Sequence, residues 1–365
     1  MMIRLKINYN MRKIFLLLVL TLSVCLLHGQ NENRLKEIRE LSKSKDTTKW
    51  LSGAGIGLDF GQLLQINPAV GAGENKIGFG GVASFYANYK DGKLAWDNVI
   101  DLLLGVQKLG GGYSTLNPNL RTPWQKSIDE LRVGSKIGFK ASSNSKFFYS
   151  LLFTFQSQLL NTYSDTSLIN PIKGNYLKDV SGKGQGPIAQ FLSPARITIS
   201  PGIDYKANKN LSVFISPASL KMIVVANDDI AAIPARKASG ETLGVGIHGN
   251  PWRSGTDYDK TLTQLGATLA AVYTNKFLKD RISFKSGLTL FSNYLKEPGN
   301  VDVDWNTETA FMIWKGISVT LNTRLFYDHD IPVQITDNDA VGGVNGIGRR
   351  ASFTEQLYIK YNYVF

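Results

Sequence analysis

Apolar and polar residues alternate along the end of the chain, in residues 351–365. One parity carries Phe353, Leu357, Ile359, Tyr361, Tyr363 and Phe365, and the other carries Gln356, Tyr358, Lys360 and Asn362. A period of two predicts a β-strand with one apolar and one polar face. The same pattern recurs from Trp50 onward, and the seventh segment is less regular, which predicts an interruption at Pro217.

The alternation predicts an all-β chain of twelve strands, within a range of ten to fourteen. The expected ranges are 50–60, 77–89, 94–106, 131–140, 147–159, 195–205, 211–225, 265–273, 282–294, 301–313, 317–327 and 351–365. Long and short connections alternate strictly between them, and many strands exceed the five or six residues usual in soluble proteins. Both features are typical of outer-membrane barrels with short periplasmic turns and long outer loops. We therefore predict a closed antiparallel transmembrane β-barrel.

The polar parity of these strands holds glycine, serine, threonine, asparagine and charged residues. A twelve-stranded barrel is too wide to be packed solid by such side chains, so the apolar parity is expected to face lipid. Aromatic residues fall near both strand ends, as lipid interfaces favour. Those near the short turns are Trp96, Tyr89, Tyr205, Tyr273, Trp314 and Phe365, and those near the long loops are Tyr163, Tyr294 and Tyr327.

The first 29 residues have the organisation of a secretory signal. Arg12 and Lys13 precede an apolar core at 14–27, and cleavage is expected near His28. Met1 and Met11 both remain open as the true start. Residues 30–49 are polar and charged, a periplasmic extension before the barrel at 50–365. No later apolar run approaches the roughly eighteen residues of a membrane helix.

The charge balance points to lipid rather than to nucleic acid. Loss of the signal, with its four basic residues, lowers the net charge from +12 to +8 and removes the one cysteine. In an exported chain we interpret this charge as attraction to anionic headgroups of outer-membrane lipid and lipopolysaccharide. A last strand ending in Phe365 resembles the closing strands of outer-membrane barrels, which makes the barrel-assembly machinery the expected partner. The predicted location is the outer membrane of a Gram-negative bacterium, and the oligomeric state stays open.

Several short motifs carry a family resemblance. They are WDN at 96–98, GIDYK at 202–206, FISPASLK at 214–221, FSNYL at 291–295, NVDVDWNT at 300–307 and YDHD at 327–330. Together they resemble a family of Bacteroidota outer-membrane barrels annotated only as a domain of unknown function. The resemblance extends over the whole mature chain and implies fold and location, without an activity or a site.

Charged residues on the polar parity are the candidates for lining a lumen. They are Asp97, Asp101, Arg132, Lys136, Lys140, Arg196, Lys285, Asp302, Asp304, Glu308, Arg324 and Lys360. We expect Asp97 and Asp101 to neighbour Arg132 and Lys136. We expect the acids of 302–308 to lie between Lys285 and Arg324, and Asp59 to meet Lys360 where the barrel closes. Rows of charged side chains on neighbouring strands form either a selectivity filter or cross-strand ion pairs. Because opposite charges lie on adjacent strands here, ion pairs are favoured. The balance of positive and negative charges argues against strong selectivity for anions or cations.

Glycines on one parity of the first two strands predict a thin wall. They are Gly53, Gly55, Gly57, Gly61, Gly78 and Gly80. They either make room for an inward-folded loop or the N-terminal segment, or relieve strain in a curved sheet.

Catalytic and metal-binding signals are weak. His329 lies at an outer strand end, after a strand that carries Ser318 and Asn322, residue types that a lipid hydrolase would use, but it is expected to point inward and no GxSxG occurs. Residues 244–249 match GxGxxG outside a strand-to-helix context, so we interpret them as a flexible loop. Acidic pairs at 228–229, 257–259 and 337–339 offer oxygen ligands for calcium in outer loops, without a full calcium-loop pattern.

The sequence therefore predicts a non-enzymatic barrel without a cofactor, most simply a porin-like path for a small polar solute. A non-conducting structural or surface-binding barrel is the alternative. An outer-membrane lipid hydrolase is the third and least favoured hypothesis.

Overall fold

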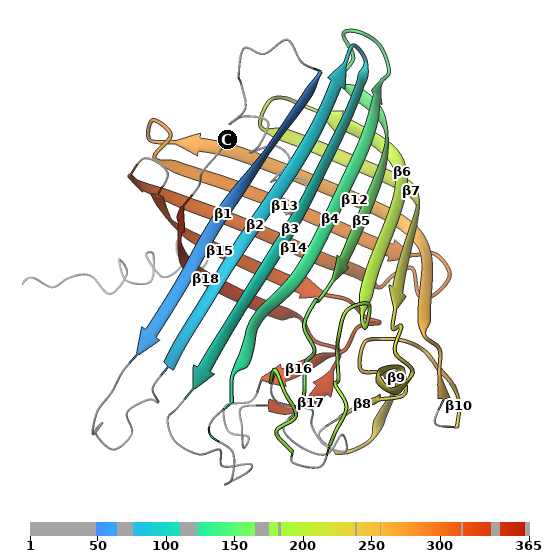
Figure 1. Ribbon diagram of the computed structural model, residues 1–365. Helices are drawn as coiled ribbons and strands as arrows, with labels where there is room; N and C mark the ends of the chain where they lie inside the picture. The colour runs from blue at the N-terminus through green and yellow to red at the C-terminus, as the bar shows by residue number, and fades with distance from the viewer. Residues whose placement is uncertain are drawn as a thin grey trace, which may run out of the picture.

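The computed structural model describes residues 49–63, 76–109, 121, 123–164, 175–181, 184–237, 239–255, 257–314, 317–336 and 344–361. Twelve long strands form one antiparallel sheet (Figure 1). They are β1 (Trp50–Leu63), β2 (Lys76–Asp91), β3 (Leu94–Leu109), β4 (Gln125–Lys140), β5 (Phe147–Ser157), β6 (Ala195–Lys206), β7 (Leu211–Val224), β12 (Thr261–Phe277), β13 (Ile282–Asn293), β14 (Val301–Trp314), β15 (Ile317–Tyr327) and β18 (Ser352–Tyr361). The prediction of twelve strands is confirmed. The expected signal peptide, and most of the expected extension at 30–49, lie outside the described residues.

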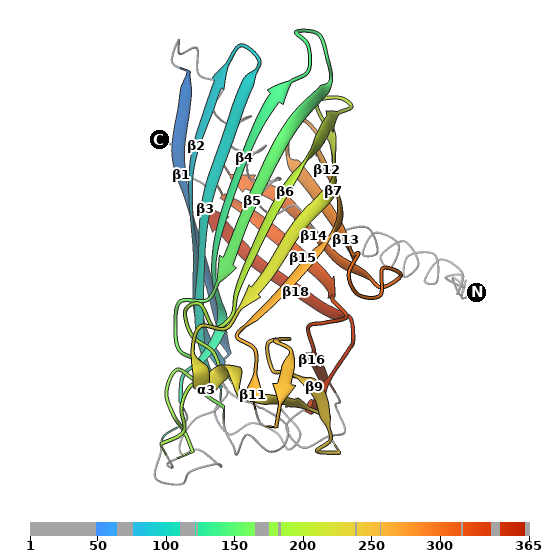
Figure 2. The ribbon, with the colours of Figure 1, turned by 90° about the vertical axis from the view of Figure 1, so that its right-hand side faces the viewer.

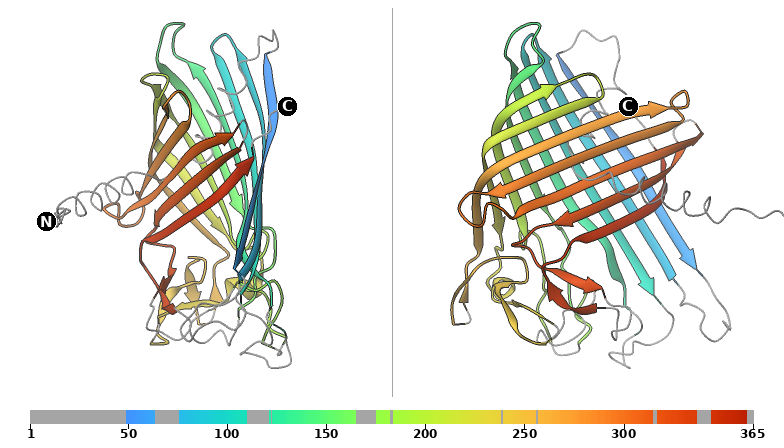
Figure 3. Two further views of the ribbon diagram at one scale, coloured as in Figure 1. Left: turned by 90° about the vertical axis from the view of Figure 1, so that its left-hand side faces the viewer. Right: turned by 180° about the vertical axis from the view of Figure 1, so that it is seen from behind.

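Each long strand is hydrogen-bonded to the next one along the chain, so the sheet order is β1-β2-β3-β4-β5-β6-β7-β12-β13-β14-β15-β18. The sheet rolls round until β1 and β18 approach each other to within 8 Å between Cα atoms. Among the described residues no hydrogen-bonded pairing joins these two edges. β18 is inclined to β1 where they approach (Figures 1 and 3), which prevents a continuous ladder. The structure thus shows a rolled sheet and not the closed ring that the sequence predicts.

The connections differ in length at the two ends of the sheet. One end has short turns, such as the one at Gly92, where a φ of 54° suits a residue without Cβ. The other end carries most of the long connections. Residues 294–300, however, join β13 to β14 in a brief turn at the long-loop end, so the strictly alternating pattern predicted from the sequence is wrong there.

Irregular pairing surrounds Pro217 in β7, as the sequence predicts. The register between β7 and β12 shifts between Gly266 and Thr268, and that between β6 and β7 shifts between Ile199 and Ile203. Proline has no backbone N–H to donate to a ladder, so a local bulge is the expected accommodation.

The long loops contain structure that the alternation does not predict. The loop from 225 to 260 forms α3 (Asp228–Ala231), β8 (Pro234–Arg236), β9 (Thr242–Gly246), β10 (Trp252–Ser254) and β11 (Asp257–Tyr258), and the last loop forms β16 (Val333–Thr336) and β17 (Val344–Gly348). These elements gather below the sheet at its long-loop end (Figure 2). We call this group, together with residues 184–194, the loop cap.

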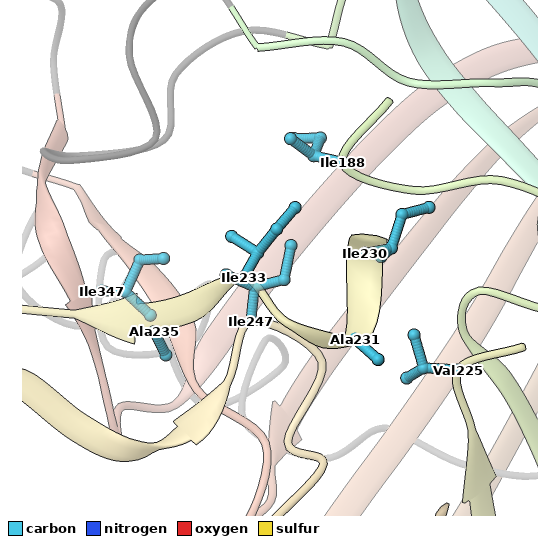
Figure 4. Packing of buried hydrophobic residues seen from close by; sticks show 8 residues of the cluster. All are labelled: Ile188, Val225, Ile230, Ala231, Ile233, Ala235, Ile247 and Ile347. Carbon is cyan, nitrogen blue, oxygen red and sulfur yellow. The ribbon is translucent and has the colours of Figure 1, made fainter. Parts of the chain in front are cut away.

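The loop cap has its own hydrophobic core (Figure 4). Its buried members are Ile188, Val225, Ile230, Ala231, Ile233, Ala235, Ile247 and Ile347. They come from three different loops, so the loops fold on one another. The isoleucines of this core lie mostly beside alanine, glycine and proline, without a sustained period, which explains why the sequence predicts only loops here.

The faces of the large sheet are exposed in the opposite sense to those of a water-soluble protein. Large apolar side chains on its outer face are exposed, with Leu58 at 67 % and Phe85 at 53 %. On its inner face Asp101 is 0 % and Asp204 is 1 % exposed. The parity assignment made from the sequence, polar side inward and apolar side outward, is confirmed. Among the described residues, no helix is long and apolar enough to cross a membrane.

Aromatic rings cluster on the outer face at the short-turn end. The rings of Trp50 and Tyr89 lie 5.1 Å apart, and Trp50 meets Trp96 edge-on at 5.8 Å. Further round the sheet, Phe147 stacks on Tyr205 at 4.7 Å. Phe365 lies outside the described residues.

Candidate functional site: the charged interior

Ion pairs join strands that are not neighbours in the sheet, and so connect different parts of its inner face. Lys221 on β7 is the centre of one group. Its Nζ donates to Asp302 Oδ2 on β14 at 2.8 Å and to Asp328 Oδ2, directly after β15, at 2.5 Å. These partners lie in the motifs FISPASLK, NVDVDWNT and YDHD, so residues distant in sequence meet at one point. The sequence analysis missed Lys221 and Asp328 as interior residues, although their opposite charges within distinctive motifs were a usable signal.

The acidic residues of β14 lie between basic residues, in the arrangement that the sequence predicts. Arg324 on β15 binds Asp304 through two hydrogen bonds, from Nε at 2.9 Å and from Nη2 at 2.7 Å. Lys285 on β13 faces Glu308 in register and donates to it at 3.1 Å. A forked guanidinium–carboxylate pair also fixes the orientation of Arg324.

Farther round, the register places Asp97 opposite Lys136 and Asp101 opposite Arg132. Lys136 also reaches past β5 to Asp204 on β6, at 3.2 Å. Arg132 forms an ion pair with Glu130 on its own strand, and Glu130 also accepts a hydrogen bond from Gln156. Asp204 and Glu130 were missed by the sequence analysis, because contacts beyond the neighbouring strand depend on how tightly the sheet curls.

Not every candidate residue reaches this network. Lys140 lies at the end of β4, where its Nζ donates to the Ser143 carbonyl in the short turn at 2.6 Å. The side chains of Asp59 and Lys360 lie outside the described ones, so their expected pairing is untested. Gly53 makes room for the ring of Tyr86, because a Cβ there would lie 2.3 Å from its hydroxyl oxygen. At that point the thin wall admits a neighbouring side chain.

Arg196 on β6 differs from the other interior cations. Among the described residues, no carboxylate lies within 4.0 Å of its guanidinium, and its buried Nε–H has no hydrogen-bond acceptor. The guanidinium carbon lies 5.7 Å from the centroid of Phe326, and Arg324 approaches the same ring at 5.2 Å. Two arginines from different parts of the sheet thus converge on one aromatic side chain.

Three cavities surround these arginines. They measure about 230, 510 and 220 Å³, and Arg196 and Arg324 line all three. The largest is lined by the basic residues Lys126, Arg132, Arg196 and Arg324 and by two acids, Asp129 and Glu130. The smallest lies against the loop cap, at Ile247 and Pro332, and its lining contains no acid among the described residues.

The loop cap meets these cavities through His248, which lines two of them. Its Nε2 lies 2.8 Å from the Ile188 carbonyl, which only accepts, so the ring donates through Nε2. Burial lowers the pKa of His248 to about 4, and the charge of Arg196 acts in the same direction. The imidazole is therefore neutral at pH 7 and adds no charge to the cavities.

The GxGxxG match at 244–249 forms part of this packed cap. A Cβ on Gly246 would lie 2.1 Å from Asn250 Oδ1. Asn250 is 0 % exposed, and its amide donates to the carbonyls of Ala231 and Asp259 at 2.9 and 3.0 Å. The expectation of a flexible loop is therefore wrong, because the glycines allow close approach of a buried asparagine.

His329 has polar neighbours but no serine among its described contacts. The Tyr327 hydroxyl lies 3.2 Å from its Nδ1, and Glu297 lies 3.6 Å from its Nε2. A hydrolytic triad requires a serine hydroxyl within hydrogen-bonding reach of the imidazole. The described contacts of His329 therefore do not assemble one.

The described acidic loop pairs face basic side chains. Asp228 forms an ion pair with Lys260, and Asp257 and Asp259 lie 3.9 and 3.8 Å from Arg253. In the part of the chain that the structure describes, no group of three or more acidic, histidine or cysteine residues has the arrangement of a metal site. Asp337 and Asp339 lie outside that part.

Comparison with known proteins gives limited matches. Residues 65–163 match a family described as "Protein of unknown function (DUF3078)". This fits the expected resemblance to a domain of unknown function, but it includes only the first of the quoted motifs, at 96–98. No curated protein matches the chain.

Solved structures with an overall likeness are outer-membrane proteins. The translocator domain of the autotransporter NalP from Neisseria meningitidis has 7 % identity and a TM-score of 0.34, over 90 % of this chain and 94 % of that one. The COG4313 outer membrane channel from Pseudomonas putida F1 has 12 % identity and a TM-score of 0.37, over 86 % and 94 %. The NanC porin has 8 % identity and a TM-score of 0.34, over 85 % and 100 %. Similarity at this level carries no functional argument.

Proposed function

We propose that this protein is a β-barrel of the bacterial outer membrane whose polar interior passes a small polar solute. The observation that carries the proposal is the inverted exposure of the sheet, with apolar side chains outside and charged ones inside. In water, exposure of so many large apolar side chains would be unfavourable, whereas in a bilayer they meet hydrocarbon. The polar and charged groups of the inner face then need water or a solute, or pair with one another.

In this proposal β1 and β18 join to close the barrel in the membrane. Unpaired backbone groups cost several kcal/mol each in hydrocarbon, so an open edge is not stable there. The approach of these strands to within 8 Å between Cα atoms supports the proposal, since the two edges that have to pair already lie near each other. The aromatic rings at the short-turn end then lie at the periplasmic interface, and the loop cap at the outer surface. The C-terminal strand would be the segment offered to the assembly machinery.

A non-conducting barrel is the second candidate, and a specific observation favours it. The loop cap has a hydrophobic core of its own, and ion pairs such as Lys221 to Asp302 cross the interior. Both features obstruct a wide path. A lipid hydrolase has weaker support, because the described contacts of His329 include no serine, and we propose no enzymatic activity.

Conductance measurements separate the two candidates. The purified protein, inserted into planar bilayers in 1 M KCl, is expected to give discrete current steps smaller than those of a wide general porin. Absence of any current above the bare bilayer would exclude solute passage. Co-flotation of the protein with vesicles after an alkaline carbonate wash tests membrane insertion separately, so that a silent barrel is distinguished from a protein that never entered the bilayer.

A further inference from the structure

We propose that Arg196 and Arg324 form an oxyanion-binding site in the interior, for the phosphate or carboxylate group of a small solute. The inference rests on the proposed function only in that a membrane barrel holds the site, since binding itself requires no passage. The sequence predicts no strong ion selectivity, because the opposite charges of the interior balance. The proposed site favours anions nevertheless, because the pairing of those charges is uneven.

The first step is the distribution of charge. Arg324 is matched by Asp304, Arg132 by Glu130 and Lys126 by Asp129. Lys221 takes two carboxylates, those of Asp302 and Asp328. The total is therefore nearly balanced, yet the surplus acid lies at Lys221 and leaves Arg196 unmatched among the described residues.

The second step is the energetic consequence of that position. Arg196 is partly buried, and its Nε–H has lost water without gaining a hydrogen-bond acceptor. Phe326 and the more distant carboxylates of Asp328 and Glu130 offset only part of that loss, because none of them accepts a hydrogen bond from the guanidinium. An anion entering the cavity would compensate for this loss through charge-assisted hydrogen bonds, which are the strongest class of hydrogen bond in proteins. The planar fork of arginine suits two oxygens of a phosphate or carboxylate group.

The third step is the shape and sign of the space. Arg196 and Arg324 line all three cavities, but the one of about 230 Å³ is also lined by Asp302, Asp304 and Asp328, so the other two are the better positions for an anion. The cavity of about 510 Å³ has four basic and two acidic lining residues, and the one against the loop cap has two arginines and no acid among its described lining. The guanidinium carbons of both arginines lie within 6 Å of the centroid of the Phe326 ring, at 5.7 and 5.2 Å. The site is therefore positive and lies next to the loop cap.

The test is calorimetric titration of the detergent-solubilised protein with inorganic phosphate, and in parallel with succinate. Saturable binding of at least one probe is expected, and the tighter probe identifies the phosphate or carboxylate class. Arg196→Gln should weaken this binding by about tenfold or more, the loss of at least one charge-assisted hydrogen bond. Arg253→Gln is the matched control, because its side chain is 68 % exposed on the loop cap and should leave affinity unchanged.

Reversal potentials across a KCl gradient provide the second arm. Wild-type protein is expected to prefer chloride, and Arg196→Gln to shift the preference toward potassium, while Arg253→Gln does not. If binding is present without current, the site stands and solute passage is excluded. If current is present but neither probe binds, or if Arg196→Gln binds as tightly as wild type, the site is refuted and the barrel remains. If Arg196→Gln fails to fold, Arg196→Lys is the substitute variant, since lysine keeps the positive charge but lacks the paired N–H donors of the guanidinium. An affinity equal to that of the wild type in Arg196→Lys would also overturn the proposal.

Discussion

An arginine placed on the outer face at mid-strand should destabilise the protein far more than one placed near a strand end. Leu269 lies at the centre of β12 and is 38 % exposed, whereas Phe277 ends the same strand and is 44 % exposed. If the outer face met water, an arginine would cost about the same at both positions. If it meets hydrocarbon, the costs differ, because the cost of a charge on the lipid face of a barrel depends on its depth in the bilayer.

The strand geometry gives the expected magnitude. Position 277 is eight residues further along the strand than position 269. At about 3.4 Å per residue they lie roughly 27 Å apart along the strand, or roughly 20 Å in depth at a tilt of about 40°. Half of the hydrocarbon layer is about 15 Å, so a strand centred in the bilayer carries Phe277 into the interface. Relative to alanine, arginine should cost about 2–4 kcal/mol at position 269 and about 0–1 kcal/mol at position 277.

Equilibrium unfolding by urea in lipid vesicles, followed by tryptophan fluorescence, measures these differences. The variants are Leu269→Arg and Phe277→Arg, each compared with alanine at its own position, so that loss of the original side chain cancels. Equal costs at the two positions would refute the assignment of hydrocarbon to the outer face. So would a cost below about 0.5 kcal/mol at position 269, because that is within the range of ordinary surface substitutions.

Three further predictions concern the interior and the loop cap. Lys221→Met leaves Asp302 and Asp328 without their shared cation, so the free energy of unfolding should fall by about 3–5 kcal/mol. In the same urea assay this loss of stability should be smaller at pH 5 than at pH 8. An equal loss at both pH values would contradict the role of charge. Ile230→Ala removes a side chain that is 0 % exposed in the loop-cap core, and should destabilise the cap by about 2–5 kcal/mol. Limited proteolysis should then cut within residues 226–260, while the gel mobility of the unheated barrel stays unchanged. If the variant resists proteolysis as well as the wild type does, the cap is not a cooperative unit. His248 stabilises the cap in its neutral form, because burial lowers its pKa to about 4 from an ordinary 6.5. Protonation then favours the unfolded loop. The contribution of His248 to the stability of the loop cap, at most about 3 kcal/mol, is therefore complete above pH 6.5 and declines as the pH falls from 6.5 toward 4. Amide hydrogen exchange of the cap should show this decline in the wild type and not in His248→Gln.

The sequence predicts the strands well where alternation is unbroken. The third strand is expected at 94–106 and extends over Leu94–Leu109. The fourth is expected from 131 but begins at Gln125, because a register shift near Lys126 interrupts the alternation. The eighth expected strand, 265–273, continues at both ends to Thr261 and Phe277 through polar residues, which a pattern based on apolar positions overlooks.

The interior is only partly predictable for a geometric reason. Alternation assigns a residue to a face, and strand order supplies its neighbours in the ladder, so the pairing of Lys285 with Glu308 follows from local information. The contacts of Lys136 with Asp204 and of Lys221 with Asp302 depend on curvature, which no local pattern encodes. The sequence names Arg196 as a candidate interior residue, but the same limit keeps it from showing that no carboxylate among the described residues pairs with Arg196.

The uneven pairing also bears on how a solute would pass. In the proposed barrel, a path along the interior would run by Lys221, which already binds two carboxylates, and by Arg196, which binds none among the described residues. A cation approaching Lys221 would compete for its partners while meeting a positive surplus around Arg196. An anion meets attraction at Arg196 and need not break an existing pair to bind there. Among the described residues, the ion pairs across the rolled sheet thus leave Arg196 available, and we expect that asymmetry, rather than the total charge, to set which sign of solute the interior accepts.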